Sequence, residues 1–500
     1  MKKIFILLLA ILIAASIYTY LTGASKRTDV PVISWKSDAN PQRYEQIDMY
    51  HKFLQKNGVV KEDGSPRGQL VLDTASNQST LIQAVSGMAG DIFDCFAVTD
   101  YAAMGVGVDV TEQANRNGYG LNTTYEGMWS QLSLGGRQYA YPCNGAVPAL
   151  WVNVDTFKKY GLPVPPQEWT PEEFEELGKR FVKLANAGSR RQLCFFVPSV
   201  ESSSFAMPIL RSMGKDVYNE TMTRSVANTP ELAKVFELLY KWTYEDRIAP
   251  TAADVASMNA DATGYGGANF SNFLQGRYAM IVTGRYGLIR FREFERQVTF
   301  SLSQLPMYDF KNLLITVRAA MPYGRTKSPE LVDMFLRFLA SYEYNKYIID
   351  FADGLPPNPH IVEEDLKQLK FKYPREGITH ELEIGWAQTI AIPESRPRYL
   401  KAGTPNWLGN SISEFFNGRK SAQEAAEYVE YRYNLEIDTA CEANPATRAD
   451  WEEQMHVQAR IDEYKAAGKK IPVEWISNPF HIRYYRKMGM LVETTTAGAR

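Results

Sequence analysis

The sequence predicts an α/β protein built from two or more lobes. Its 500 residues exceed what one hydrophobic core usually holds, so more than one lobe is expected. Short apolar runs that fit buried strands alternate with amphipathic segments that fit helices. This alternation is typical of a parallel sheet covered on both faces. A hydrophobic content of 45% and an aromatic content of 12% indicate a folded chain.

The strands and helices of the first third follow one another closely. Val30–Trp35 fits the first strand, and the turn after it contains Asp38. A helix is expected to run from this turn to about Gln55. The remaining elements of this part are a strand at Leu70–Asp73, a helix at Asn77–Ser86, a strand opening at Asp91-Ile92 and a helix opening at Asp100.

The middle and the end of the chain continue the same alternation. The expected strands lie at Tyr139–Pro142, Leu150–Val154, Leu193–Val197, Tyr278–Val282 and Phe300–Leu305. We read Tyr278–Val282 as a strand of a covered parallel sheet, because it is apolar throughout. The expected helices include the segments that follow Thr170 and Ser328, together with Glu231–Tyr244 and Trp451–Ala467.

The N-terminus indicates export. Lys2 and Lys3 precede the uncharged apolar run Ile4–Thr22. A basic start followed by an apolar run is the pattern of a signal peptide, and we assign residues 1–24 to it. The run is also long enough to stay in the membrane as an anchor. Both readings stay open.

Charge and cysteine spacing exclude several classes of protein. A net charge of −2 gives no field that would recruit nucleic acid or an anionic membrane. Cys95, Cys143, Cys194 and Cys441 are widely spaced and form no C-x-x-C pair, which argues against a zinc site. We expect these cysteines to be buried free thiols. The many aromatic residues, 29 Tyr among them, suit sugar rings as well as a large core.

Several stretches match a known family in order. The quoted segments are GRYAM and GRY (Gly276–Met280 and Gly284–Tyr286), the long run from Gly135 to Phe181 that contains YAYP and TFKKYGL, the run from Met321 to Ile348, and DGLP at Asp353–Pro356. Over roughly residues 30–435 the chain resembles the extracellular solute-binding proteins of ABC transporters, family 1, the branch that includes maltose-binding protein. Residues 440–500 lie outside this resemblance and form a C-terminal extension.

The resemblance implies a fold of the periplasmic-binding-protein type II kind. Two α/β lobes would be joined by a hinge near Tyr141–Pro148, with the ligand cleft between them. The first lobe would comprise residues 30–141 plus about 310–353. The second would comprise residues 142–309 plus about 354–435.

The resemblance also implies a function. Such a protein captures a small polar ligand, most often a carbohydrate, by hinge closure and delivers it to an ABC permease outside the cytoplasm, in the periplasm or at the cell surface. We expect a monomer that needs no cofactor or metal and binds no nucleic acid. Arg285 stands where relatives carry a small residue or proline, which would favour an acidic sugar. The implied ligand-binding residues are Trp35, Asp38, Phe96, Asp100, Asn144, Arg285, Tyr286, Asp353 and Trp407.

Two other functions stay open beside this one. A carbohydrate-active hydrolase needs two facing carboxylates, and their separation cannot be read from a sequence. Walker A, H-E-x-x-H, G-x-S-x-G and EF-hand patterns are absent from the sequence, which argues against an enzyme. A membrane-anchored scaffold is the other alternative. In that case the aromatic and basic run Phe480–Met490 would contact the partner. The alternative is that this run belongs to an appended helix that packs on a lobe.

Overall fold

The computed structural model describes residues 30–74, 77–96, 98–258, 265–401 and 403–493. The predicted signal or anchor at residues 1–24 lies outside the described residues. Along those that are described, no helix has both the length and the apolar character needed to cross a membrane. They form two compact units. The smaller unit ends at Asp94 and also takes in Pro322–Phe338, and the larger unit holds the rest.

The smaller unit is a parallel sheet with helices. The strand order is β2–β1–β3, and β1 pairs in parallel with both neighbours. Its core contains Trp35, Tyr50 and Phe335; the Phe335 ring centroid lies 5.2 Å from that of Trp35 and 5.5 Å from that of Tyr50. The elements are β1 (Val32–Lys36), α2 (Gln42–Lys56), β2 (Gln69–Asp73), α3 (Asn77–Val85), β3 (Ile92–Cys95) and α14 (Pro329–Leu339).

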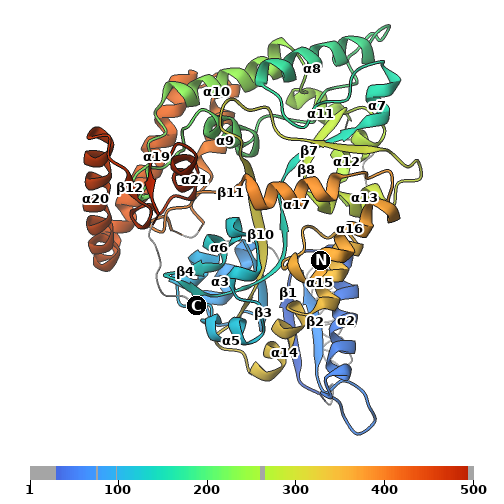
Figure 1. The fold of residues 1–500 in the computed structure, drawn as a ribbon, viewed down its shortest axis with the longest axis vertical. Coiled ribbons are helices and arrows are strands. Elements are labelled where there is room, and N and C mark those ends of the chain that lie inside the picture. Colours follow the sequence, from blue (N-terminus) through green and yellow to red (C-terminus); the bar gives the residue numbers. More distant parts are fainter. Residues whose placement is uncertain (1–29, 75–76, 97, 259–264, 402, 494–500) are drawn as a thin grey trace, which may run out of the picture. The chain divides into compact units, whose positions relative to one another are not determined.

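The larger unit is built around two sets of paired strands that share no strand (Figure 1). In the first sheet, β10 (Leu313–Pro322) runs parallel to β11 (Ala391–Pro393) and antiparallel to β6 (Tyr141–Ala146). The second sheet has the order β8–β7–β9 and is antiparallel throughout. Its strands are β7 (Ala149–Asn153), β8 (Met280–Thr283) and β9 (Phe300–Ser303).

Helices surround these sheets in the larger unit. Helix α8 shows why they begin where they do: Thr170 and Glu173 form a reciprocal capping box, and Pro171 occupies the first helical position. The helices are α4 (Val98–Ala103), α5 (Thr111–Arg116), α6 (Glu126–Leu132), α7 (Val154–Lys159), α8 (Pro171–Ala185), α9 (Ser203–Ser212), α10 (Pro230–Tyr240), α11 (Ala252–Met258), α12 (Gly267–Leu274), α13 (Leu288–Phe291), α15 (Tyr342–Asp350), α16 (Glu363–Lys372), α17 (Thr379–Thr389) and α18 (Trp407–Phe416).

The C-terminal extension is folded. In Figure 1 it continues from the long helix α19 as an orange to red group of elements. Its own small core is made by Ile461, Ile471, Ile476, Tyr485 and Leu491, all buried. It begins at the end of α19 (Ala422–Ala443) and contains α20 (Pro445–Ala466), β12 (Ile471–Pro472), α21 (Pro479–Lys487) and β13 (Leu491–Val492). The short hairpin strands β4 (Ser133–Leu134) and β5 (Arg137–Gln138) lie earlier in the larger unit.

Three strand predictions need correction. The run at Tyr278–Val282 is an antiparallel strand, because burial on both faces makes a run apolar whichever way its neighbour points. Leu193–Val197 forms no strand and contributes one bridge, from Phe195 to Tyr278. Pro142 does not end its strand but lies inside β6, next to an irregularity in the pairing with β10.

The segment predicted as a hinge connects the two sheets of the larger unit. Strand β6 ends at Ala146 and β7 begins at Ala149, so Val147 and Pro148 carry the chain from one sheet to the other. The chain returns between β9 and β10. Near the first crossing, Gly145 and Leu355 exchange two backbone hydrogen bonds of 3.1 and 2.7 Å. The lobe boundaries drawn from the sequence stay predictions.

Candidate ligand-binding site

The larger unit contains a cavity of about 560 Å³. A volume of this size is typical of sites for small molecules. The residues around it come from segments that are far apart in the sequence: the start of α4, the end of α6, the loop after α9, the loop between β11 and α18, and the loop before α21. Several of them carry aromatic or hydrogen-bonding side chains, namely Phe96, Gln131, Tyr218, Thr221, Glu394, Arg396, Arg398, Asn406, Tyr433 and Ser477.

An exposed aromatic ring lines this cavity. Phe96 follows β3 directly, and 59% of its surface is accessible to solvent. Tyr218 and Tyr433 also line the cavity but are almost wholly buried, with ring centroids 5.2 Å apart. The tyrosines therefore belong to the wall, whereas Phe96 has a free face. A free aromatic face is suited to stacking on a flat apolar surface such as that of a sugar ring.

Two arginines of the cavity are held by carboxylates. Arg396 reaches Asp100 with both ends of its guanidinium group, at 3.2 and 2.9 Å. Arg398 donates to Asp450 at 2.7 Å. Such bidentate or close pairing fixes an arginine in place and neutralises its charge. Both arginines follow β11, so the pairs also anchor the loop that leaves this strand.

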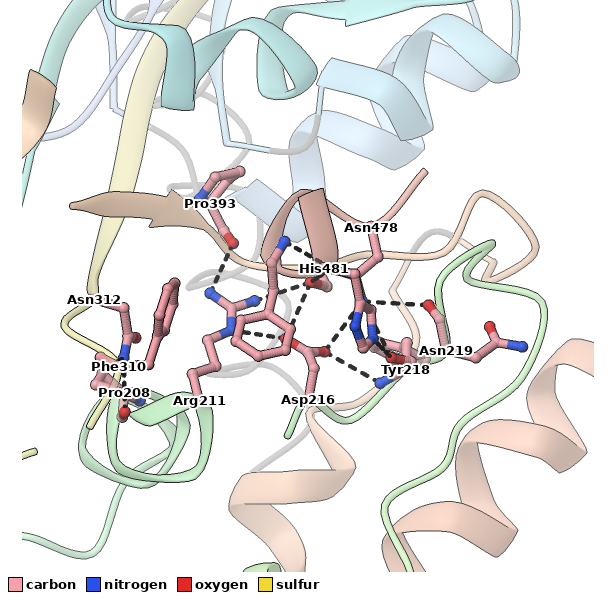
Figure 2. Close-up of polar contacts among 12 residues, drawn as sticks. Pro208, Arg211, Asp216, Tyr218, Asn219, Phe310, Asn312, Pro393, Asn478 and His481 are labelled. Carbon is pink, nitrogen blue, oxygen red and sulfur yellow. Dashed lines mark hydrogen bonds and ion pairs between the residues drawn. The ribbon is translucent and has the colours of Figure 1, made fainter. Parts of the chain in front are cut away.

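Beneath this loop lies a buried polar network, which Figure 2 shows. Arg211 of α9 is fully buried and donates to Asp216 at 2.7 Å, to the carbonyl of Pro393 at 3.0 Å and to the hydroxyl of Ser395 at 2.9 Å. Ser395 in turn donates to Asn478 at 2.8 Å. A buried ion pair with its neighbouring groups hydrogen-bonded is rigid. The network therefore holds Ser395, which lines the cavity, in a fixed position.

The structure places two predicted site residues in the smaller unit. Trp35 is fully buried: its indole N–H donates to Asp94 at 2.8 Å, and its ring packs on Phe335. A side chain without exposed surface cannot stack on a ligand, so we correct this assignment and give Trp35 to the core. Asp38 is half exposed and pairs with Arg43 at 2.7 Å. The residues that line the cavity all belong to the larger unit.

Arg285 also needs correction. Its guanidinium group is fully buried and donates to His380 and to the carbonyls of Ile348, Ile349 and Gly354. The donors that a sugar carboxylate would need are thus already used within the protein. The argument from Arg285 for an acidic sugar therefore no longer holds.

Asn144 and Asp353 lie together at the crossing between the two sheets. Asn144 donates to the backbone carbonyl of Asp353 and accepts a hydrogen bond from Arg318 at 3.3 Å. The Asp353 carboxylate lies 3.7 Å from the same arginine, and the side chains of this ion pair are buried. Asp353, only 1% exposed, therefore serves the crossing rather than the cavity surface. Neither Asn144 nor Asp353 lines the cavity.

Tyr286 and Trp407 are half-buried and lie outside the cavity lining. Tyr286 follows the turn at Gly284 and packs against it. Trp407 opens α18, with the guanidinium group of Arg432 over its ring at 3.7 Å. Its neighbours Asn406 and Leu408 do line the cavity. Of the predicted residues, therefore, Phe96 lines the cavity and Asp100 pairs with Arg396, which lines it. Trp407 does not line the cavity but lies between two residues that do.

Sequence reasoning missed several residues of the cavity. Arg396 carried a recognisable signal, because it closely follows a strand, and the carboxyl ends of parallel strands are where α/β sheets bind ligands. No comparable signal marks Tyr218, Ser477 or Pro479. Tyr218 lies in the loop after α9, whereas Ser477 and Pro479 belong to the C-terminal extension, and contacts between residues far apart in the chain bring them to the same cavity. Among the described residues, no group of His, Cys, Asp or Glu is arranged to hold a metal ion.

Two α/β units, two sheets joined by crossing segments, and a cavity that combines an exposed aromatic ring with hydrogen-bonding groups are the features of a binding protein of the periplasmic type. The chain belongs to the family described as bacterial extracellular solute-binding protein, which matches residues 65–346. No curated protein sequence matches the chain.

Solved structures of the same fold resemble most of the chain. The ABC substrate-binding protein Lmo0181 from Listeria monocytogenes, in complex with cycloalternan, has 18% identity and a TM-score of 0.68, over 81% of this chain and 99% of its own. A solute-binding protein from Thermotoga lettingae bound with α-D-tagatose has 13% identity and a TM-score of 0.65, over 81% and 100%. MalE3 of T. maritima, bound to maltose, has 15% identity and a TM-score of 0.64, over 81% and 100%.

Membership of the family decides several of the open questions. It is a family of solute-binding proteins and not of enzymes, so the hydrolase alternative is set aside. The family is extracellular, which implies a location outside the cytoplasm. It also implies an ABC transporter as the partner.

Proposed function

We propose that this protein captures a neutral carbohydrate or polyol in the 560 Å³ cavity and delivers it to an ABC permease. The observation that carries the proposal is the exposed ring of Phe96 in a cavity whose lining combines apolar side chains with hydrogen-bonding groups. Sugars need both an apolar platform and donors and acceptors for their hydroxyls. The solved relatives bound to cycloalternan, tagatose and maltose support a ligand of this class.

The charges around the cavity favour a neutral ligand. Arg396 and Arg398 line it, but each is paired with a carboxylate. Glu394 adds a further carboxylate to the lining. An anionic ligand would have to compete with Asp100 and Asp450 for the arginines and would face the charge of Glu394. A neutral polyol can accept hydrogen bonds without displacing either pair.

The proposal includes closure around the ligand. Val147 and Pro148 connect the two sheets of the larger unit, and a change of their backbone angles would move one sheet against the other. We further propose that the protein works as a monomer. Tyr286 and Trp407 stay proposed ligand contacts, made when the protein closes.

Calorimetric titration of sugars tests the proposal. Maltose, maltotriose, D-tagatose, D-mannitol and cycloalternan form the first panel, after a thermal-shift screen. Phe96→Ala is expected to lower the affinity for the bound sugar by about 1–3 kcal/mol, by analogy with the stacking of nucleobases on aromatic side chains. Its melting temperature should stay unchanged, because the side chain is exposed.

Phe371→Ala provides the matched control. Phe371 is 71% exposed on α16 and does not line the cavity, so its loss should change neither affinity nor melting. Equal affinities for wild type and Phe96→Ala would remove Phe96 from the site. Failure of all sugars and polyols to bind the wild type would overturn the proposed function.

A further inference from the structure

One buried residue, Glu220, takes several of the hydrogen bonds that hold the C-terminal extension to the rest of the larger unit. Glu220 is 3% exposed and accepts hydrogen bonds from Gln458, Lys465 and Tyr485, at 2.8, 2.6 and 2.5 Å. Its backbone carbonyl also accepts the N–H groups of Ser477 and Asn478, both at 2.9 Å. Five donors from the extension thus converge on one residue of the loop after α9.

Asn478 then fixes the position of the loop before α21 (Figure 2). Its side chain is fully buried and donates to the carbonyl of Tyr218 at 3.1 Å. Its carbonyl oxygen accepts from the hydroxyl of Ser395 at 2.8 Å and caps α21 through Phe480 at 3.0 Å. Tyr218 and Ser395 both line the cavity. A single asparagine therefore ties the extension to two walls of the cavity.

The residues on either side of Asn478 reach the cavity. Ser477 is exposed, Pro479 is half-buried, and both line it. Thr221 also lines the cavity, and the extension holds it through Gln458 at 3.1 and 3.0 Å. This part of the cavity therefore exists only because the extension is docked.

We propose that the C-terminal extension is part of the ligand site, with Ser477 and Pro479 forming an end wall that limits the length of the oligosaccharide. This inference rests on the proposed function, because it assigns the wall to a sugar-binding cavity. A wall held by buried hydrogen bonds is rigid, so a longer sugar cannot push it aside without breaking them. Selectivity by length then follows from a steric limit rather than from an added attraction.

A bulky substitution at the wall tests the inference. Ser477→Trp adds an indole at an exposed position and leaves the backbone N–H to Glu220 in place. The probes are maltose, maltotriose and maltohexaose, together with the sugars and polyols of the first panel. In Ser477→Trp, the affinity for the longest sugar that binds wild type should fall by about tenfold or more. The affinity for the shortest sugar should fall by a smaller factor. Melting should be unchanged.

Ala467→Trp is the control on the same extension. Ala467 is exposed and does not line the cavity, so this variant should bind every sugar as the wild type does. If sugars bind wild type and Ser477→Trp leaves all affinities unchanged, the wall is overturned while the proposed function stands. If no sugar or polyol binds wild type, the proposed function fails and the wall fails with it. A lowered melting temperature in Ser477→Trp calls for Ser477→Leu as the second variant, with the same two outcomes.

Discussion

Arg285 donates hydrogen bonds to backbone carbonyls in the last turn of α15, although it does not belong to that helix. The final carbonyls of a helix have no partner within it, and here Ile348 and Ile349 receive the Arg285 guanidinium group. The same side chain binds Gly354 at 2.9 Å and His380 at 2.9 Å, so it joins α15, the following turn and α17. Burial lowers the pKa of Arg285 to about 10, which leaves it charged at neutral pH. Arg285 is thus a structural residue of the larger unit.

Arg285→Lys is expected to destabilise the protein by about 2–5 kcal/mol, because an ammonium group cannot reach all these acceptors and leaves buried carbonyls unpaired. Urea unfolding measures the change. Arg296→Lys, at an exposed position, should cost almost nothing. Normal stability of Arg285→Lys combined with weakened sugar binding would return Arg285 to the ligand site.

Glu383 is a buried residue that contacts the predicted hinge. It accepts the backbone N–H groups of Val147 at 3.4 Å and Arg285 at 3.1 Å. Burial raises the pKa of Glu383 from 4.5 to about 7. Between these pH values the unfolded chain releases a proton that the native protein keeps, so the contribution of Glu383 to stability falls as pH rises through this window.

Glu383→Gln removes this titration and keeps an acceptor for both N–H groups. Relative to the variant, the wild type should lose up to about 3 kcal/mol of unfolding free energy between about pH 4.5 and pH 8. The comparison with the variant is necessary because burial lowers the pKa of His380 to about 4, which adds stability over nearly the same range as pH rises. Urea unfolding of both proteins at several pH values is the measurement, and parallel profiles would contradict the assignment.

At the scale of elements, α20 and α21 are held in place by hydrogen bonds from their side chains to the carboxylate of Glu220. Burial alone would raise the pKa of this carboxyl, but His481, Lys465 and Tyr485 lower it to about 2. The stability that this provides is present above pH 4.5 and is lost as pH falls towards 2. Aromatic residues of the run Phe480–Met490 also pack inside the protein, because Phe480 and Tyr485 are buried. This favours packing over a contact with a membrane partner for these two residues.

Tyr485→Phe removes the hydroxyl group that donates to Glu220 and keeps the aromatic ring. We expect a loss of about 1–3 kcal/mol in unfolding free energy, because the buried carboxylate is left with one partner fewer. Tyr431→Phe is the matched control, since Tyr431 is 58% exposed on α19. If both variants melt alike, the hydroxyl of Tyr485 does not contribute to the docking of the extension.

At the scale of the whole molecule, the connection between the sheets predicts closure on binding. A sugar that binds residues on both sides of the Val147–Pro148 crossing would favour the closed state, because some of its hydrogen bonds and ring stacking form only in that state. Small-angle scattering at saturating sugar should then give a smaller radius of gyration than without sugar. The Phe96→Ala variant should keep the same radius of gyration at a sugar concentration that leaves this variant unbound. An unchanged radius in the saturated wild type would contradict hinge closure.

Local pattern was enough for the elements and the family. Capping residues and runs of apolar residues are local, so helix α8 begins at its predicted cap and the first strands lie within two residues of their predicted bounds. The ordered matches over residues 30–435 came from the same local stretches, which is why the family could be identified from one sequence.

The tertiary structure decided what each residue does. The sequence by itself determined the α/β fold, the order of its elements and the family, because those depend on short-range spacing. It could not show that Trp35 and Arg285 are buried, that β8 pairs antiparallel with β7, or that Ser477 lies beside the cavity. Burial, strand direction and cavity walls depend on contacts between residues far apart in the chain, and those contacts leave no periodic trace in the sequence.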